Sequence, residues 1–479
     1  MSQRSFFRRP HRDATSPAPR RAAFLLLLGL ILPIASLSAV PLSGPYPDAW
    51  KKLGAPDSPA GKRLASFLEV LRTADEASTR DFVASVLDAG FHEEDGVGPL
   101  VQQTLQMAKD LSGFEVMGMR GEPNGDVRAR IRTRDGAERM IGLGVDPAPP
   151  HLVNGLMIRP VDELMDDLPP IRTVEEADAL LTKLAKAGRF GGALLVAQGG
   201  EVVLERGYGP ARRDPDVAAT PGTLFDVGSI TKAFTRVAVL QQVAAGKLSL
   251  DDTLGQHVSG FPAEIAGRVR VRHLLNMTSG FGDYLAEPRF QNDNSRFDTV
   301  GKLVELIRAQ ELAFAPGEGR RYSNAGYVLL GAILESVTGR DYYELIEKDV
   351  FARAGMKNSR FLTGDDPAAA MGYMRAPDSE RLVPNKSVIP YKGSPAGSSY
   401  STAGDLYRFQ LAMGSDELGA GRDAARDGCI AGGAPGVNAI SCVDREADLY
   451  VVLMANVDEG PAERVGIDLF RALQNAGDE

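Results

Sequence analysis

Motifs of several common enzyme classes are missing from this chain of 479 residues. With two cysteines and five histidines, it has neither a C-x-x-C nor an H-E-x-x-H motif, so nothing indicates a zinc site. It also lacks a P-loop, which removes the usual indication of nucleotide binding. A G-x-S-x-G nucleophile elbow, as in the α/β-hydrolases, is missing as well. We therefore expect no metal and no other cofactor.

An excess of basic residues is missing too. The chain has 54 Lys and Arg against 63 Asp and Glu, which gives a formal net charge of −9. A nucleic-acid-binding protein needs a basic face to meet phosphates, so no nucleic-acid partner is expected. Hydrophobic residues make up 43% of the chain, an ordinary globular composition, and the length suits two or three domains.

The N-terminus contains a short apolar run with basic residues before it. Six arginines precede the run Ala22–Leu32, and small residues follow it up to Ala39. This order is typical of a secretory signal peptide, which we expect to span residues 1–39. A membrane anchor is the alternative, but the run is shorter than the ~20 residues that span a bilayer, and Pro33 interrupts it. We expect a periplasmic or secreted protein with no stable transmembrane span after signal cleavage.

Residues 46–168 carry a pattern of helices followed by strands. Apolar residues recur at helical spacing after Ser58-Pro59, a pair typical of a helix start. A period of two then predicts successive strands, bounded by turn residues such as Asn124-Gly125. This order predicts a small α+β domain, which resembles NTF2-like, cystatin-like domains in outline. It carries no catalytic constellation, and we expect that it mediates protein contacts. Pro169-Pro170 ends it.

The residues that point to chemistry lie in the second body, residues 172–475. Apolar residues at helical spacing follow Ser229, so we expect this serine at the N-terminus of a helix. Lys232 lies three residues later, one turn along on the same face. A desolvated lysine with a lowered pKa can accept the proton of a serine hydroxyl. The alternative for Lys232 is a surface lysine, because S-x-x-K also arises by chance.

A second candidate element is the loop before another apolar helix. Tyr322 and Asn324 are two residues apart, so both side chains can face one pocket. Tyr322 can relay a proton between the serine and a leaving group, and Asn324 can orient the lysine and a substrate amide. The alternative is a loop tyrosine that only caps the helix.

Together these motifs resemble the serine β-lactamase-like hydrolases that use Tyr-x-Asn, which include class C β-lactamases, penicillin-binding DD-peptidases, D-aminopeptidases and many esterases. Matching stretches lie at residues 225–235, 246–252, 273–280, 316–339, 395–405 and 450–456. The resemblance implies an α+β fold, with an antiparallel sheet flanked by helices beside a helical subdomain. It implies that Ser229 is the nucleophile, Lys232 the general base, and Tyr322 with Asn324 the proton relay and orienting pair.

The third motif of this family departs from its usual form. Relatives carry Lys-Thr-Gly or His-x-Gly on a strand opposite the serine, and here the basic position is Ile430. Gly432 and Gly433 are kept as candidate substrate-binding residues, so the strand can still approach a substrate closely. The backbone N–H groups of Ser229 and Gly433 can form an oxyanion hole. Loss of the cation argues against penicillins and D-Ala peptides and favours neutral esters.

The segment before this strand is also short, with nineteen residues between Phe409 and Cys429. We therefore expect the sheet edge to be rebuilt or partly missing. A hairpin centred on Pro435-Gly436 would place Cys429 opposite Cys442, within disulfide range. The alternative is two buried free thiols.

The sequence predicts an exported serine hydrolase that forms an acyl-enzyme on Ser229 and hydrolyses an ester or amide of a small molecule or peptide. A catalytically silent periplasmic binding or scaffold protein is the first alternative, motivated by Ile430. A β-lactamase or DD-peptidase proper is the second. Asp283 and Tyr284, which follow a Ser-Gly turn, either line the rim of the pocket or only stabilise their loop.

Overall fold

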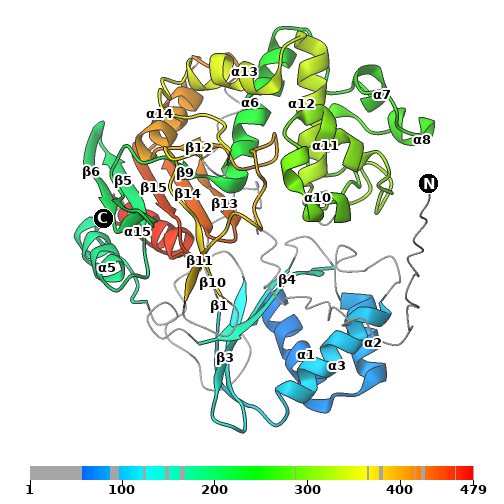
Figure 1. The fold of residues 1–479 in the computed structure, drawn as a ribbon, viewed down its shortest axis with the longest axis vertical. Helices are drawn as coiled ribbons and strands as arrows, with labels where there is room; N and C mark the ends of the chain where they lie inside the picture. The colour runs from blue at the N-terminus through cyan, green and yellow to red at the C-terminus, as the bar shows by residue number, and fades with distance from the viewer. Residues whose placement is uncertain are drawn as a thin grey trace, which may run out of the picture.

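The computed structural model describes residues 57–86, 97–121, 126–145, 150–161, 168–285, 287–363, 366–376, 381–415, 417–421, 427–458 and 460–477 (Figure 1). The signal peptide expected at residues 1–39 lies outside these ranges. Within them, no helix is long and apolar enough to cross a membrane.

Three helices and a four-stranded antiparallel sheet form the N-terminal part of the described chain. Their bounds are α1 Pro59–Thr73, α2 Glu76–Val86, α3 Gly98–Asp110, β1 Glu115–Gly121, β2 Val127–Arg132, β3 Glu138–Val145 and β4 Val153–Pro160, with the sheet order β1-β2-β3-β4. The Ser58 side chain accepts a hydrogen bond from the Gly61 N–H, and Pro59 opens α1. The apolar side of β2, including Ala129 and Ile131, is buried in a core of its own.

A five-stranded antiparallel sheet organises the rest of the chain, in the order β13-β14-β15-β5-β6. Its strands are β5 Gly192–Gln198, β6 Glu201–Tyr208, β13 Gly428–Ala434, β14 Val437–Asp444 and β15 Leu449–Ala455. The sheet thus joins a hairpin from the start of this region to three strands from its end. The predicted α+β class with antiparallel sheets is confirmed. The edge strand itself is present, because β13 pairs with β14 along its whole length, and the described residues 415, 417–421 and 427 before it contain no strand.

Two helices cover one face of this sheet, α5 Val174–Lys186 and α15 Ala462–Gly477 (Figure 1). Their apolar sides and the sheet form a core that includes Leu181, Val451 and Phe470. Two-stranded ladders connect loops nearby, and their strands are β7 Pro210–Arg213, β8 Asp216–Ala218, β9 Phe225–Asp226, β10 Tyr373–Arg375, β11 Leu382–Pro384 and β12 Tyr400–Ser401.

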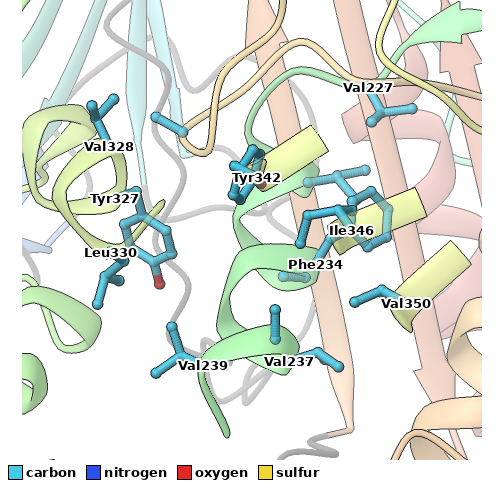
Figure 2. Close-up of a cluster of buried hydrophobic side chains, with 14 of the residues drawn as sticks. Val227, Phe234, Val237, Val239, Tyr327, Val328, Leu330, Tyr342, Ile346 and Val350 are labelled. Atoms are coloured by element: carbon cyan, nitrogen blue, oxygen red, sulfur yellow. The ribbon is translucent and has the colours of Figure 1, made fainter. Parts of the chain in front are cut away.

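The helices of the other side centre on α6, Thr231–Ala244. Around it lie η2 Gly228–Ile230, α7 Leu254–His257, α8 Ala263–Ala266, α9 Val271–Leu275, α10 Pro288–Asn292, η3 Asn294–Arg296, α11 Val300–Ile307, α12 Asn324–Thr338, α13 Tyr342–Ile346, η4 Glu347–Phe351 and α14 Ala403–Gly414. Figure 2 shows α6 between side chains of α12, such as Tyr327, and side chains of α13 and η4. The Phe234 ring meets the rings of Phe351 and Phe409 edge-on, at centroid distances of 4.9 and 4.7 Å. This packing fixes α6 and the residues at its N-terminus.

Candidate active site

Ser229 lies in a single 3₁₀ turn, η2, that connects β9 directly to α6. Gly228 adopts a positive φ of 51°, a conformation that glycine accepts without strain. The Asp226 carboxylate holds this turn by accepting a hydrogen bond of 2.7 Å from the Gly228 N–H. Burial raises the pKa of Asp226 to about 6. The turn is therefore fixed from the strand side, and Ser229 stands at the helix start as the sequence predicts.

Lys232 is fully buried one turn further along α6. Its Nζ donates to Ser229 Oγ at 3.1 Å, to Asn324 Oδ1 at 2.7 Å and to the carbonyl oxygen of Ala396. Burial lowers the pKa of Lys232 to about 7, and the negative charge of Asp283 partly opposes this shift. Lys232 is therefore not a surface lysine. With a pKa of about 7, a substantial fraction of its amine is neutral near pH 7.

Tyr322 and Asn324 reach the same serine and lysine from the start of α12. The Ser323 side chain caps this helix by accepting a hydrogen bond from the Gly326 N–H at 2.8 Å. On either side of this cap, Tyr322 places its hydroxyl 2.6 Å from Ser229 Oγ, and Asn324 binds Lys232. Burial raises the pKa of Tyr322, so the phenol stays protonated. The structure thus brings all four predicted catalytic residues into one hydrogen-bonded network.

Asp283 also belongs to this network, which the sequence alone does not reveal. Its Oδ2 accepts a hydrogen bond of 2.7 Å from Asn324 Nδ2, and its Oδ1 accepts one of 2.9 Å from the Leu285 N–H. The two side chains are 41 positions apart in the chain, so no local motif connects them. Tyr284 instead points into the interior at 2% exposure, which excludes it from the rim of a pocket.

Strand β13 meets the nucleophile turn backbone to backbone. A Cβ on Gly432 would lie 2.0 Å from the Val227 carbonyl oxygen and 2.8 Å from the Ser229 nitrogen, so only glycine fits. A Cβ on Gly228 would likewise lie 2.8 Å from the Gly433 nitrogen. The backbone of Gly432 and Gly433 thus lies against the backbone of residues 227–229, and the oxyanion hole of the Ser229 and Gly433 amides stays a prediction. Ile430 shares the sheet face of Gly432, because side chains alternate along a strand.

The two cysteines lie directly opposite each other at the far end of this hairpin from its turn. Cys429 of β13 pairs in register with Cys442 of β14, and a disulfide joins them with a Cα–Cα distance of 4.0 Å. Cys442 is fully buried. The bond fastens the edge strand that carries Gly432 to its neighbour.

We expect that replacing both cysteines by serine lowers the free energy of unfolding by about 2–4 kcal/mol, because the bridge restricts the unfolded chain. Urea unfolding of the oxidised protein and of the double variant measures the difference. The reduced wild-type protein serves as the control and should match the variant. Equal midpoints for all three proteins would contradict the expectation.

In the described part of the chain, no three His, Cys, Asp or Glu side chains are grouped so that they could hold a metal ion. The chemistry of the network is instead that of an activated hydroxyl: a serine between a buried amine and a phenol. Such a serine can attack a carbonyl carbon and transfer its proton to the amine.

Comparison with known proteins agrees with this chemistry. A family model described as Beta-lactamase matches residues 171–428. Penicillin-binding protein 4* of Bacillus subtilis is 30% identical over 253 residues, which are 50% of this chain and 55% of that protein. The chain thus spans about half the length of this curated relative.

Solved structures of similar fold also align with this chain. A penicillin-binding protein from Bacillus halodurans aligns with a TM-score of 0.55 and 27% identity, over 62% of this chain and 98% of that chain. A D-amino acid amidase from Ochrobactrum anthropi aligns with a TM-score of 0.54 over 64% of this chain and 99% of that chain. At 22% identity, the amidase shows a shared fold alone.

Proposed function

The chain belongs to the β-lactamase family of serine hydrolases, and we propose that it is an exported hydrolase that forms an acyl-enzyme on Ser229. Its substrates in this proposal are uncharged esters or amides. The observation that carries the proposal is the geometry around Ser229 Oγ, which has the Lys232 amine at 3.1 Å and the Tyr322 hydroxyl at 2.6 Å.

The proposed acylation follows from these contacts. Ser229 Oγ attacks the substrate carbonyl carbon while its proton passes to the neutral Lys232 amine. The negative charge that develops on the carbonyl oxygen is stabilised by the N–H groups of Ser229 and Gly433. The bond to the leaving group then breaks as Tyr322 donates its proton to that group, and the Lys232 ammonium reprotonates Tyr322 and becomes a neutral amine again. In a second step water attacks the acyl carbon and gives a proton to this amine. The acid leaves, and the proton returns to Ser229 Oγ.

The preference for uncharged substrates rests on Ile430. This side chain is partly buried against the core, on the face of β13 that meets the nucleophile turn. The family places a lysine or histidine there, which can pair with a substrate carboxylate. An isoleucine offers only apolar contact, so a carboxylate would lose its hydration without a partner. We therefore favour ester or amide substrates over penicillins and D-Ala peptides.

The test is intact-mass measurement of purified protein after exposure to a fluorophosphonate and, separately, to a penicillin. We expect a single fluorophosphonate adduct on the wild-type protein and none on Ser229→Ala. An adduct with penicillin would instead indicate a β-lactamase or DD-peptidase. Folded wild-type protein that reacts with neither reagent would contradict the hydrolase proposal and favour a silent binding protein on the same fold.

The pH dependence of the reaction follows from the pKa of Lys232. The amine must be neutral to accept the serine proton, and its pKa is about 7. The rate constant for modification of Ser229 should therefore rise with pH through about 7 and level off above about pH 8. Rate constants of adduct formation, measured at a series of pH values from about 5 to about 9, give this profile. A flat profile over that range would exclude Lys232 as the base.

A further inference from the structure

The loop that carries Asp283 is fastened to the start of α12. The Gly282 carbonyl oxygen accepts hydrogen bonds from the Ser323 hydroxyl and from the Ala325 N–H, each at 3.2 Å. Gln310 Nε2 donates to the Asp283 carbonyl oxygen at 3.1 Å. With its Oδ1 held by the Leu285 N–H, the Asp283 carboxylate has a fixed direction, and its Oδ2 meets Asn324.

This carboxylate decides how the Asn324 amide is oriented. An amide can present either its oxygen or its nitrogen to a neighbour, whereas both carboxyl oxygens of Asp283 accept N–H donors in this structure. Because Nδ2 must face Asp283, Oδ1 must face Lys232, at 2.7 Å from its Nζ. A flipped amide would point an N–H at the ammonium group and lose both hydrogen bonds.

The orientation of Asn324 in turn decides where the lone pair of Lys232 points. A protonated amine has three N–H bonds, and the structure gives it three acceptors: Ser229, Asn324 and the Ala396 carbonyl. The neutral amine keeps two N–H bonds. The two carbonyl-type oxygens bind both of these, so the lone pair is left for the hydroxyl of Ser229. The acceptor on Asn324 is thus required for the amine to face the nucleophile as a base.

Asp283 also affects the Lys232 amine through its negative charge. The groups that face Lys232 are the hydroxyl of Ser229, the rings of Tyr322 and Tyr327 at 4.7 and 5.7 Å, and the acceptors already named. Asp283 is the acid that acts on Lys232 through charge, and Lys232 and Arg321 are the cations that act on Asp283. A negative charge near the amine favours its protonated form.

We propose that Asp283 is a positioning residue that orients the Asn324 amide and thereby the lone pair of Lys232 toward Ser229. The inference rests on the proposed function and extends it to a residue outside the motifs of the nucleophile, the base and the Tyr-Ser-Asn loop.

Asp283→Asn tests the proposal, with the rate constant of fluorophosphonate modification measured across pH. The substituted amide no longer forces one orientation on Asn324, so the maximal rate should fall about tenfold or more. Removal of the negative charge should also move the rising limb of the profile to lower pH, by about one unit. Asp293→Asn removes a charge from an exposed residue ten positions further along the chain and should leave the limb in place.

A swap variant keeps the test decisive if Asp283→Asn does not fold. Asp283→Asn combined with Asn324→Asp retains one carboxylate and one amide in the same volume, and it brings the carboxylate into contact with Lys232. Its limb should lie at higher pH than in the wild-type protein, because the nearer negative charge raises the pKa of the amine.

The rising limb should therefore lie at the lowest pH for Asp283→Asn, at an intermediate pH for the wild-type protein and at the highest pH for the swap variant. A folded Asp283→Asn protein that keeps the wild-type maximal rate would overturn the positioning role, because the maximal rate reports the orientation of Asn324. Limbs that coincide with the wild-type limb would overturn the effect of the Asp283 charge on Lys232. Wild-type protein without any modification would overturn the proposed function itself, so the two failures are distinguishable.

Discussion

Lys232→Met is expected to slow the modification of Ser229 by about a thousandfold, within the usual range for removal of a general base. The serine would keep its Tyr322 contact but would lose the buried amine that accepts its proton in the proposed mechanism. Methionine fills most of the space of the lysine stem, but it leaves the Asn324 and Ala396 oxygens without their donor, so folding of the variant is checked separately. The measurement is the rate constant of adduct formation at a pH near 8.

A lysine outside the network provides the control for this experiment. Lys247 lies exposed after the C-terminal end of the same helix, and Lys247→Met should react at the wild-type rate. A thermal transition at or above the wild-type temperature would show that Lys232→Met is folded. A folded Lys232→Met protein that reacts within about tenfold of the wild-type rate would contradict the assignment of the base.

Gly432→Ala is expected to have the second largest effect, a loss of about a hundredfold or more in the same rate constant. The added Cβ would lie 2.0 Å from the Val227 carbonyl oxygen, which is backbone and cannot rotate away. The strand and the nucleophile turn would have to separate, which would disrupt the proposed oxyanion hole of the Ser229 and Gly433 amides. Loss of one oxyanion donor alone typically costs about 10²–10³ in rate.

Gly433→Ala is the matched comparison on the neighbouring residue. Its Cβ would meet only the Val437 carbonyl oxygen, at an ordinary contact distance of 3.6 Å, and its backbone N–H is kept. We expect a far smaller loss than for Gly432→Ala. Similar losses in both variants, measured on proteins with similar unfolding temperatures, would contradict the backbone contact as the cause.

The sequence predicts the local parts of this molecule well, because their causes are local. The spacing of Ser229 and Lys232 indicates one helical face, and both lie there. Alternation and turn residues predict the hairpin of β13 and β14, and its register is the one that the position of Pro435-Gly436 implies. Helix starts such as Ser58-Pro59 follow from the hydrogen-bonding needs of the first turn.

The parts that the sequence does not reveal depend on contacts between distant segments. From the sequence, Asp283 is only a loop residue. Its contact with Asn324 becomes evident when the fold places the start of α12 beside this loop. The order of the five-stranded sheet pairs β15 with β5, although more than 200 residues separate them along the chain. The close approach of Gly432 to Val227 is of the same kind, since the glycines predict a close approach to a substrate but not the direct contact with the backbone of the nucleophile turn.

The backbone contact of β13 has a consequence for how such an enzyme can diversify. Gly432 is closed to any side chain, and the disulfide at Cys429 fastens the same strand to β14. Ile430 lies between these two fixed points, and its side chain is only partly buried against the core. In the proposed function, a substitution at this one position would change which substrates bind, while Gly432 and the disulfide keep the strand in place. Substrate selectivity and reactivity would thus depend on different residues of one strand.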